Sequence, residues 1–329
     1  MKIAIITDGN NTLGMGHIYQ SKTIADFLSE KTDNLADIFF ITKSNELVRD
    51  ILKSTGKKVY YFENDSFILD KLKVLKPNIV IFDKLDVSPA LAKQVKTELI
   101  TKLVIFTNLT KANDYADITV LADIGSNFKN IINVNPESGG KQYFGPKFWI
   151  LRPEFYKLKS KIKKINERFS EIMLIFGGSD PSNISSQVLN ELMQIDLAFN
   201  ILLVLGSAFE HNDELNAVID KNKGSKSTVN IVRNITNVGE TMHKSDLVFA
   251  SPGLSFFEAL TVGTPVIGFH QNELQREVYA EILPTMGIED IQKLPEIIQN
   301  KTFLYPEDPI VSAMEIGDGK DEIITEILN

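Results

Sequence analysis

The stretch KSDLVFASPGLSFFEALTVGTPVIGFHQNELQ, residues 244–275, contains the strand–loop–helix–strand pattern of an α/β protein. The apolar run at 246–250 predicts a buried strand, and a short loop with proline and glycine separates it from a helix expected near 255–262. A second apolar run, near 265–268, restarts the sheet. Apolar residues fill these strands continuously, which is typical of parallel strands covered by helices on both faces of the sheet.

The same alternation runs along the whole chain. Residues 152–168, with Pro153 and many lysines and no strand pattern, separate two series of this alternation, and we place a domain boundary there. Because alternation of this kind builds doubly wound sheets, we expect an α/β protein of two doubly wound, parallel-sheet (Rossmann-like) domains that face each other across a cleft. The other strands are expected near 2–6, 36–42, 57–61, 79–83, 102–106, 117–121, 171–176, 200–205 and 229–232. The other helices are expected near 17–30, 45–55, 66–75, 88–98, 183–194, 212–222, 238–244 and 273–286.

Composition narrows the classes of protein further. At 329 residues the chain is too long for one ordinary core, since single cores stop growing near about 250–300 residues. The chain has no cysteine, which excludes disulfides, thiolate nucleophiles and cysteine-bound zinc. No apolar run approaches the roughly 20 residues of a membrane-spanning helix, so we expect no transmembrane segment. The absence of cysteine fits a cytoplasmic protein, which is the location we expect. A net charge of −8 also argues against a nucleic-acid partner, because such proteins usually have a basic excess.

The first loop of the chain carries the candidate catalytic residue. In DGNNTLGMGHIYQSKTIADFL, residues 8–28, Gly14 and Gly16 precede a helix expected to begin at His17. Glycines let the backbone turn tightly and approach a ligand, although the spacing is not that of a dinucleotide-binding loop. A helix N-terminus disfavours positive charge, so we expect the ring of His17 to stay neutral and to suit a general base. The alternative is a histidine that only caps the helix or packs.

Two later loops are candidate anion sites. In EIMLIFGGSDPSN, residues 171–183, a strand is followed by Gly177 and Gly178, and then by Ser179 and Asp180 just before a helix. Free amides and hydroxyls at a helix N-terminus suit a diphosphate. The loop lacks the lysine of a P-loop, and its alternative is a tight turn with a helix cap.

The second loop follows the strand at 246–250, and its candidate residues are Ser251, Gly253, Leu254 and Ser255. The amides after Gly253 would again offer an anion site at a helix N-terminus. Glu258 follows Ser255 by three residues, so it could complete a capping box with that serine. It could instead accept hydrogen bonds from the two hydroxyls of a ribose.

Together the three loops resemble those of nucleotide-sugar enzymes with the glycosyltransferase B-type fold. Within that fold the sequence is most similar to the UDP-sugar hydrolase of the pseudaminic-acid pathway and its spore-coat polysaccharide relatives. The segment GPKFWILRPEF, residues 145–155, resembles the inter-domain segment of that family, and residues 317–320 (GDGK) resemble the start of its C-terminal helix. The resemblance therefore covers essentially the whole chain.

The resemblance implies that the two domains bind different parts of the substrate. An N-terminal domain, residues 1–150, would bind the sugar or acceptor, and a C-terminal domain, 151–308, would bind a nucleoside diphosphate, with UDP as the nucleotide that the family uses. Residues 309–329 would form a C-terminal helix that packs back toward the N-terminal domain. His17 would be catalytic, and neither a cofactor nor a metal is implied. The implied nucleotide-binding residues are Gly177, Gly178, Ser179, Asp180, Val238, Ser251, Gly253, Leu254, Ser255 and Glu258. The implied sugar-binding residues are Gly14, Gly16, Asp83, Asn272 and Gln275.

The sequence also departs from the family on the sugar side. Gln20 stands where the family usually has a basic residue, Leu85 where it commonly has an aromatic one, and Thr107–Asn108 where an acidic pair is expected. We therefore expect retained nucleotide chemistry with a different sugar or acceptor. Hydrolysis of a UDP-activated amino- or deoxy-sugar is the favoured function. The alternatives are a glycosyltransferase on the same fold and a non-catalytic sugar-nucleotide binder.

Overall fold

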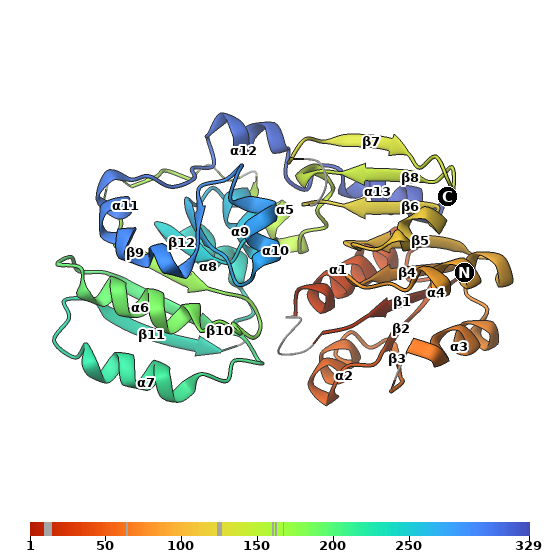
Figure 1. Cartoon of the computed structure of the whole chain (residues 1–329), viewed down its shortest axis with the longest axis horizontal. Coiled ribbons are helices and arrows are strands. Elements are labelled where there is room, and N and C mark those ends of the chain that lie inside the picture. Colours follow the sequence, from red (N-terminus) through yellow and green to blue (C-terminus); the bar gives the residue numbers. More distant parts are fainter. Residues whose placement is uncertain are drawn as a thin grey trace. The chain divides into compact units, whose positions relative to one another are not determined.

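The chain forms two compact α/β units, drawn in Figure 1. This computed structural model describes residues 1–9, 15–63, 65–123, 127–159, 161, 163–166, 168–233 and 235–329. The N-terminal unit contains residues 1–9, Gly16–Ile150 and Met314–Asn329, and the C-terminal unit contains Met15 and Leu151–Ala313. In the ranges described, no helix combines the length and the apolar character that a membrane crossing requires.

The N-terminal unit is built on an eight-stranded sheet with the order β3-β2-β1-β4-β5-β6-β8-β7. All neighbouring strands are parallel except β7, which is antiparallel to β8. The strands are β1 (Lys2–Thr7), β2 (Asp37–Thr42), β3 (Lys58–Tyr61), β4 (Ile79–Asp83), β5 (Lys102–Phe106), β6 (Ile118–Leu121), β7 (Ile131–Val134) and β8 (Lys141–Phe144). The helices are α1 (Gly16–Lys31), α2 (Glu46–Lys53), α3 (Ile68–Leu75), α4 (Pro89–Glu98) and, at the end of the chain, α13 (Lys320–Leu328).

Local sequence sets the starts of two of these helices. The side chain of Asn45 accepts a hydrogen bond from the amide of Val48 and caps α2. Ser88 caps α4 in the same way, and Pro89 supplies the first helical residue.

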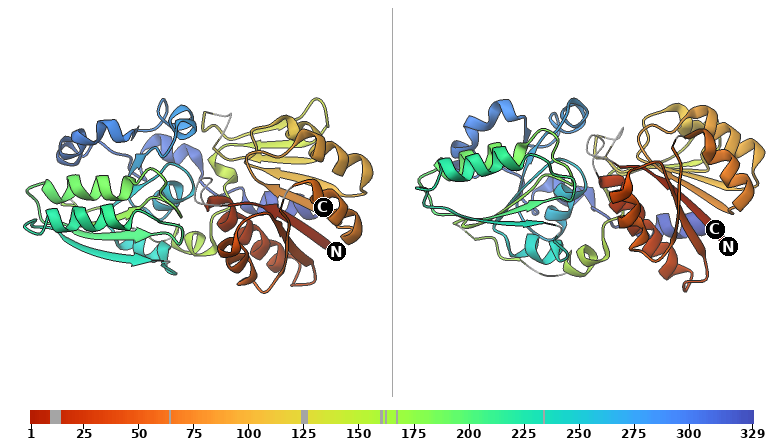
Figure 2. Two further views of the ribbon diagram at one scale, coloured as in Figure 1. Left: turned by 60° about the horizontal axis from the view of Figure 1, so that its bottom comes forward. Right: turned by 90° about the horizontal axis from the view of Figure 1, so that it is seen from below.

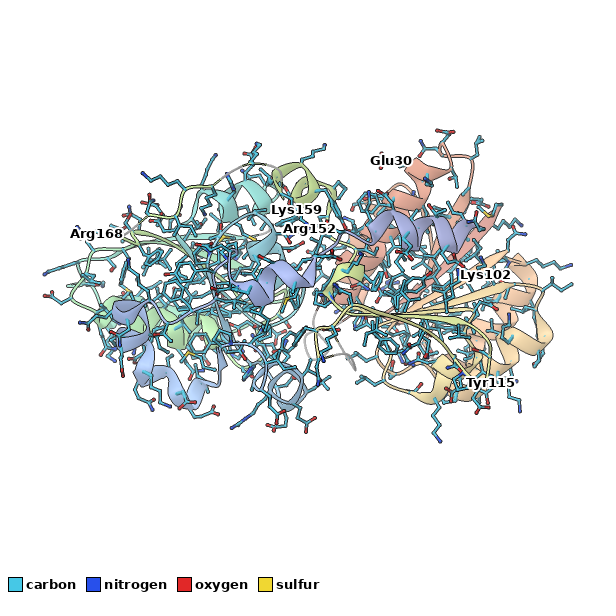
Figure 3. The ribbon with its side chains drawn as sticks, turned by 90° about the horizontal axis from the view of Figure 1, so that it is seen from above. Glu30, Lys102, Tyr115, Arg152, Lys159 and Arg168 are labelled. Carbon is cyan, nitrogen blue, oxygen red and sulfur yellow. The ribbon has the colours of Figure 1, made fainter. Side chains whose placement is uncertain are left out.

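The C-terminal helix α13 belongs to the N-terminal unit, where it packs beside α1 (Figures 1 and 2). The ammonium group of Lys320 lies 4.4 Å from the ring centre of Phe27 in α1. Lys102, labelled in Figure 3, donates a hydrogen bond of 2.9 Å to the carbonyl of Glu326. A cation–π contact and a side chain-to-backbone bond thus fix both ends of the last helix.

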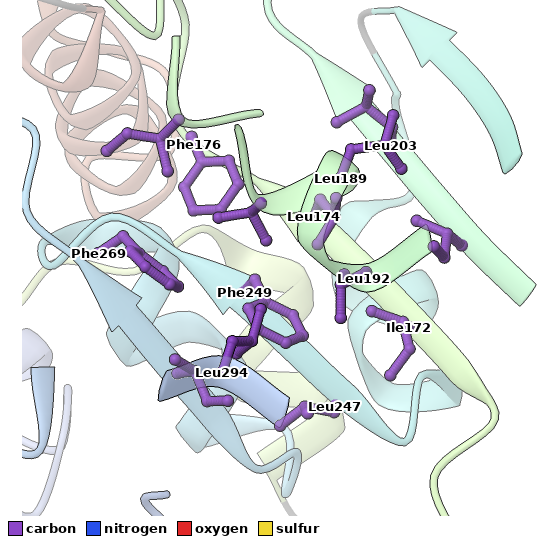
Figure 4. Packing of buried hydrophobic residues seen from close by; sticks show 14 of the residues in the cluster. Ile172, Leu174, Phe176, Leu189, Leu192, Leu203, Leu247, Phe249, Phe269 and Leu294 are labelled. Atoms are coloured by element: carbon purple, nitrogen blue, oxygen red, sulfur yellow. The ribbon is translucent and has the colours of Figure 1, made fainter. Parts of the chain in front are cut away.

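The C-terminal unit repeats the same architecture on a six-stranded sheet with the order β11-β10-β9-β12-β13-β14. The strands are β9 (Glu171–Ile175), β10 (Asn200–Leu205), β11 (Thr228–Arg233), β12 (Leu247–Ala250), β13 (Val266–Phe269) and β14 (Thr285–Met286). The helices are α5 (Pro153–Lys159), α6 (Ile184–Gln194), α7 (Asn212–Lys221), α8 (Val238–Lys244), α9 (Leu254–Thr261), α10 (Glu273–Tyr279), α11 (Leu294–Asn300) and α12 (Pro309–Met314). The core between the sheet and α6 is formed by side chains such as Ile172, Leu174, Leu189, Leu192 and Phe249 (Figure 4).

The helix predicted over 273–286 is wrong beyond Tyr279. Pro284 cannot donate a backbone hydrogen bond and disfavours helical backbone in the residue before it. The chain instead adds the short strand β14, which pairs with Gly268 and Phe269 of β13.

The predicted class, two doubly wound parallel sheets, is confirmed. In the N-terminal sheet the strand order reverses between β1 and β4, and in the C-terminal sheet between β9 and β12. Sheets of this kind bind ligands outside the carboxyl ends of the strands at these switch points. Thr7 and Asp83 pair in register at the carboxyl ends of β1 and β4. The loops after these four strands are therefore where a site is expected.

Candidate functional site

His17 and Asp83 form a hydrogen-bonded pair at the switch point of the N-terminal sheet. His17 is the second residue of α1, and Asp83 is the last residue of β4. The Nδ1 atom of His17 lies 2.7 Å from Oδ1 of Asp83, whose side chain is fully buried while that of His17 keeps 14% of its surface exposed. With Nδ1 directed at a carboxylate, Nε2 is the ring nitrogen that can take up a proton.

The surroundings of Asp83 correct the sugar-binding role assigned to it from the sequence. Its second oxygen, Oδ2, accepts a hydrogen bond of 2.8 Å from the hydroxyl of Ser21. The amide of Gln20 lies 3.4 Å from Oδ1. A carboxylate that is fully buried and surrounded by these donors is a partner of His17 instead of an acceptor for substrate hydroxyls.

The charges around His17 oppose the helix-dipole effect that was expected to keep its ring neutral. Burial lowers the pKa of His17, but the negative charge and hydrogen bond of Asp83, with smaller contributions from Asp123 and Asp86, outweigh it and raise the pKa above its usual value. The ring is therefore a stronger base than an unperturbed histidine. Its free ring nitrogen can accept a proton only at pH values above this raised pKa.

A buried ion pair lies in the adjoining loops. Asp8 follows β1 and Lys84 follows Asp83, and their charged groups approach to 2.8 Å with 5% of each side chain exposed. Burial raises the pKa of Asp8, but Lys84 and the amide of Lys43 reverse this and hold it below its ordinary value. Hydrogen bonds from Thr42 and Lys43 complete the shell of Asp8. The pair ties the loops after β1, β2 and β4 together beside the histidine.

The structure describes one of the two glycines of the histidine loop. Gly14 lies outside the described residues. Gly16 is exposed at the start of α1, and a Cβ atom added there would meet no atom of the described residues within 4 Å. The packing of the described residues therefore does not require glycine at position 16.

In the C-terminal unit, Asp180 fills the helix N-terminus that was expected to bind phosphate. Its carboxylate accepts hydrogen bonds from the amides of Ile184 (3.0 Å) and Ser185 (2.8 Å) in the first turn of α6. The side-chain amide of Gln271 donates a third bond, of 2.8 Å. The helix-cap alternative is thus correct for Asp180, because its negative charge occupies these amides.

Most of the other residues in this loop are buried or hydrogen-bonded. Gly177 is exposed with a φ of +85°, a conformation that favours glycine, and nothing lies near a Cβ atom added there. The carbonyl of Gly178 accepts a 2.9 Å hydrogen bond from Ala208 in the loop after β10. Ser179 is buried. Of the four loop residues named from the sequence, Gly177 is the one that offers exposed backbone.

The N-terminus of α9 differs from that of α6 in how its amides are capped. Gly253 is its N-cap residue, with a φ of +137°, and no side chain caps this helix within the described part of the chain. Leu254 and Ser255, its first two residues, are half-buried. The hydroxyl of Ser251 has no hydrogen-bond partner among the described residues. Amides of a helix N-terminus without a side-chain cap remain suited to an anion.

Glu258 makes neither of the contacts considered for it from the sequence. Its carboxylate is fully buried and accepts two hydrogen bonds from the guanidinium group of Arg152, of 2.8 and 2.7 Å. The capping box is wrong, because Ser255 lies inside α9 and not at its cap. Burial raises the pKa of Glu258, and the charge of Arg152 offsets part of this rise. A ribose could reach this carboxylate only after Arg152 moves.

Three further candidates lie around the same loops. Val238 is the buried first residue of α8. Asn272 caps α10 by accepting a hydrogen bond from the amide of Gln275. The side chain of Gln275 donates to the carbonyl of Pro252 (2.7 Å) and accepts from the amide of Gln271 (2.7 Å). These contacts link the loops after β12 and β13, and the sugar-binding role given to Asn272 and Gln275 stays a prediction.

Comparison with known proteins identifies relatives of this chain by sequence. No protein-family model matches the sequence. An uncharacterized protein of Methanocaldococcus jannaschii is 40% identical over 332 residues, which is 100% of this chain but 66% of that protein. The spore coat polysaccharide biosynthesis protein SpsG of Bacillus subtilis is 26% identical over 319 residues, covering 95% of this chain and 90% of SpsG. The chain thus spans about two thirds of its archaeal relative and nearly all of SpsG.

Solved structures decide the fold. MurG of Acinetobacter baumannii superposes with a TM-score of 0.61 at 12% identity, over 100% of this chain and 99% of that one. HepE of Anabaena, determined in complex with UDP-glucose, gives a TM-score of 0.56 at 15% identity. The superposition covers 100% of this chain and 96% of the HepE chain. This protein has the glycosyltransferase B-type fold. The B-type fold and the homology to SpsG agree with the coarser part of the resemblance drawn from the sequence.

Two partners of the candidate site residues, Ser21 and Arg152, were not predicted from the sequence of this B-type protein. Ser21 lies one helical turn after His17, so the spacing alone puts both side chains on one face of α1. Arg152 lies in the C-terminal unit, directly before Pro153 at the start of α5, and is labelled in Figure 3. Its partner is 106 residues away in the sequence, and no local pattern predicts such a pairing.

Proposed function

We propose that this protein is an enzyme that acts on a nucleotide-activated sugar, and specifically that it hydrolyses a UDP-linked amino- or deoxy-sugar at the anomeric carbon. The observation that carries the proposal is the 2.7 Å contact between His17 and Asp83 at the switch point of the N-terminal sheet. A substrate of the class UDP-2,4-diacetamido-2,4,6-trideoxyhexose is the one that the sequence resemblance suggests.

The chemistry needs one base and a stabilised leaving group. The oxygen of a water molecule attacks the anomeric carbon, the bond from that carbon to the diphosphate oxygen breaks, and UDP leaves with the bonding electrons. Nε2 of His17 takes the proton of the water, while Nδ1–H donates to Asp83, which stabilises the imidazolium that forms. The negative charge that develops on UDP is of the kind that helix N-terminal amides stabilise, and the start of α9 supplies such amides.

The comparisons support the nucleotide-sugar part of the proposal. SpsG bears a name in polysaccharide biosynthesis, and HepE was determined in separate complexes with UDP-glucose and with UDP. In the proposal, Gly253, Leu254 and Ser255 hold the diphosphate, with Gly177 and the hydroxyl of Ser251 beside it. The segment at Val238 is proposed to lie next to the base.

A glycosyltransferase is the second candidate, and a specific observation favours it. The solved structures with this fold include the lipopolysaccharide outer core galactosyltransferase WaaB, with a TM-score of 0.55. In a transferase, His17 would take the proton of an acceptor hydroxyl instead of a water molecule. Base and leaving group are the same in the two reactions, so the acceptor is what distinguishes them.

Proton NMR of the anomeric signal provides the test. The protein is incubated with a UDP-2,4-diacetamido-2,4,6-trideoxyhexose and no acceptor, with His17→Gln as the matched control. Free sugar and UDP that form with the wild-type protein and not with the variant would support the hydrolase. An unchanged spectrum would contradict hydrolysis of this sugar, and turnover that begins only on addition of a polysaccharide acceptor would identify a transferase.

A further inference from the structure

Three side chains on one face of α1 converge on Asp83. His17, Gln20 and Ser21 are spaced i, i+3 and i+4, which places them on the same side of a helix. Their distances to the carboxylate of Asp83 are 2.7, 3.4 and 2.8 Å. Gln20 and Ser21 are both buried. Helix α1 thus supplies the histidine together with the groups that surround its carboxylate partner.

The side chain of Gln20 also contacts the loop that follows β5. Its side-chain nitrogen lies 3.5 Å from the hydroxyl of Thr107, directly after β5. Thr107 has a φ of +50°, a left-handed conformation that β-branched residues rarely adopt, and its amide donates to the carbonyl of Val120 (2.9 Å). Backbone strain of this kind is often found at functional sites. Here it places the threonine hydroxyl beside Gln20.

The charges around this cluster are mostly negative. Asp83 contacts the ring of His17, and Asp86 and Asp123 add their negative charges to its surroundings. The ammonium of Lys84 is directed at Asp8, at 2.8 Å, and lies 3.6 Å from Asp86. Gln20 adds a donor at Asp83 without adding a charge.

We propose that Gln20, itself held by Thr107, is a positioning residue for the His17–Asp83 pair, which orients the carboxylate together with Ser21 while leaving its charge to be balanced by His17. The proposal rests on the proposed function, in which His17 is the base. A cation at position 20 would compete with His17 for Asp83, because an opposite charge nearby stabilises a carboxylate. An anion at position 20 would instead favour the protonated ring.

The test is a pair of variants of opposite charge, Gln20→Lys and Gln20→Glu. The titration midpoint of His17 is read from its ring protons by NMR, and the signal is assigned by its loss in His17→Gln. We expect the midpoint to move about one pH unit lower in Gln20→Lys and about one pH unit higher in Gln20→Glu. The acid limb of kcat/KM should move with it. The matched controls are Gln94→Lys and Gln94→Glu at an exposed position of α4, which should leave both unchanged.

Midpoints equal to the wild-type value in both Gln20 variants would overturn the proposal, even if stability or turnover fell. If one variant does not fold, the direction of the shift in the other decides. The NMR titration needs no substrate, so it separates this inference from the proposed function. Shifted midpoints in a protein that turns over no UDP-sugar would leave the positioning role in place and refute the hydrolase.

Discussion

Replacing Asp83 by asparagine tests the pair on which the proposed chemistry depends. The variant keeps the size of the side chain but removes the charge that faces Nδ1 of His17 at 2.7 Å. Because Asp83 is fully buried, little water can screen that charge. Hydrogen bonds to charged groups contribute about 1.5–3 kcal/mol, and each 1.4 kcal/mol or so lost from the transition state slows a reaction about tenfold. We therefore expect kcat/KM to fall about 10- to 150-fold, which reaches only the lower end of the roughly 100- to 10,000-fold contribution of general acid–base catalysis.

The assay is the initial rate of UDP release from a UDP-sugar at a pH above the raised pKa of His17, so that the wild-type ring is deprotonated. Asp50→Asn, at an exposed position of α2, serves as the matched control and should behave as the wild type. UDP affinity, measured by calorimetry, should be unchanged in both variants, since Asp83 is not proposed to contact the nucleotide. A kcat/KM for Asp83→Asn within about twofold of the wild type would refute the role of the pair in catalysis.

Other outcomes follow from the same contacts. The acid limb of kcat/KM should lie above the usual histidine pKa of 6.5, because the pKa of His17 is raised and the base must be deprotonated; a limb below 6.5 would contradict this. The stability from the protonated ring beside Asp83 should be fully present below pH 6.5 and lost as the pH rises through the raised pKa, so Asp83→Asn should be more destabilising at pH 6 than at pH 9 in urea unfolding. Arg152→Ala should reduce the free energy of unfolding by about 3–5 kcal/mol because it leaves the carboxylate of Glu258 buried without its partner; an unchanged urea midpoint would show that the pair is dispensable. Asp180→Ala should cost about 0.5–2 kcal/mol through loss of the α6 cap, whereas tighter UDP binding without loss of stability would return this loop to phosphate binding.

The fold was largely predictable from local sequence, and the exceptions have physical causes. Continuous apolar runs such as 79–83 and 200–205 became buried parallel strands with the expected bounds. The hairpin of β7 and β8 was missed because each strand has only four residues, too few to show a periodicity, and the apolar side chains of β7 (IINV) are exposed instead of buried in a core. The strand β14 has only two residues, which is too short for any periodicity.

The site was predictable only in part, because its partners come from distant segments. The glycine-rich loop and the helix start pointed to His17 from sequence alone. That Asp83 faces it depends on β4 lying beside β1, which the order of elements along the chain does not fix. The role of Asp180 was misjudged for a related reason. A carboxylate before a helix can repel or replace an anionic ligand, and only the structure shows its bonds to Ile184 and Ser185.

Isotope labelling of the products tests the central claim most directly. Wild-type protein is incubated with the UDP-sugar in water enriched in oxygen-18, and the sugar and UDP are analysed by mass spectrometry. The account predicts one heavy oxygen in the released sugar and none in UDP, with His17→Gln forming neither product. Heavy oxygen in UDP would mean that water attacks phosphorus, which would contradict a His17-assisted displacement at the anomeric carbon.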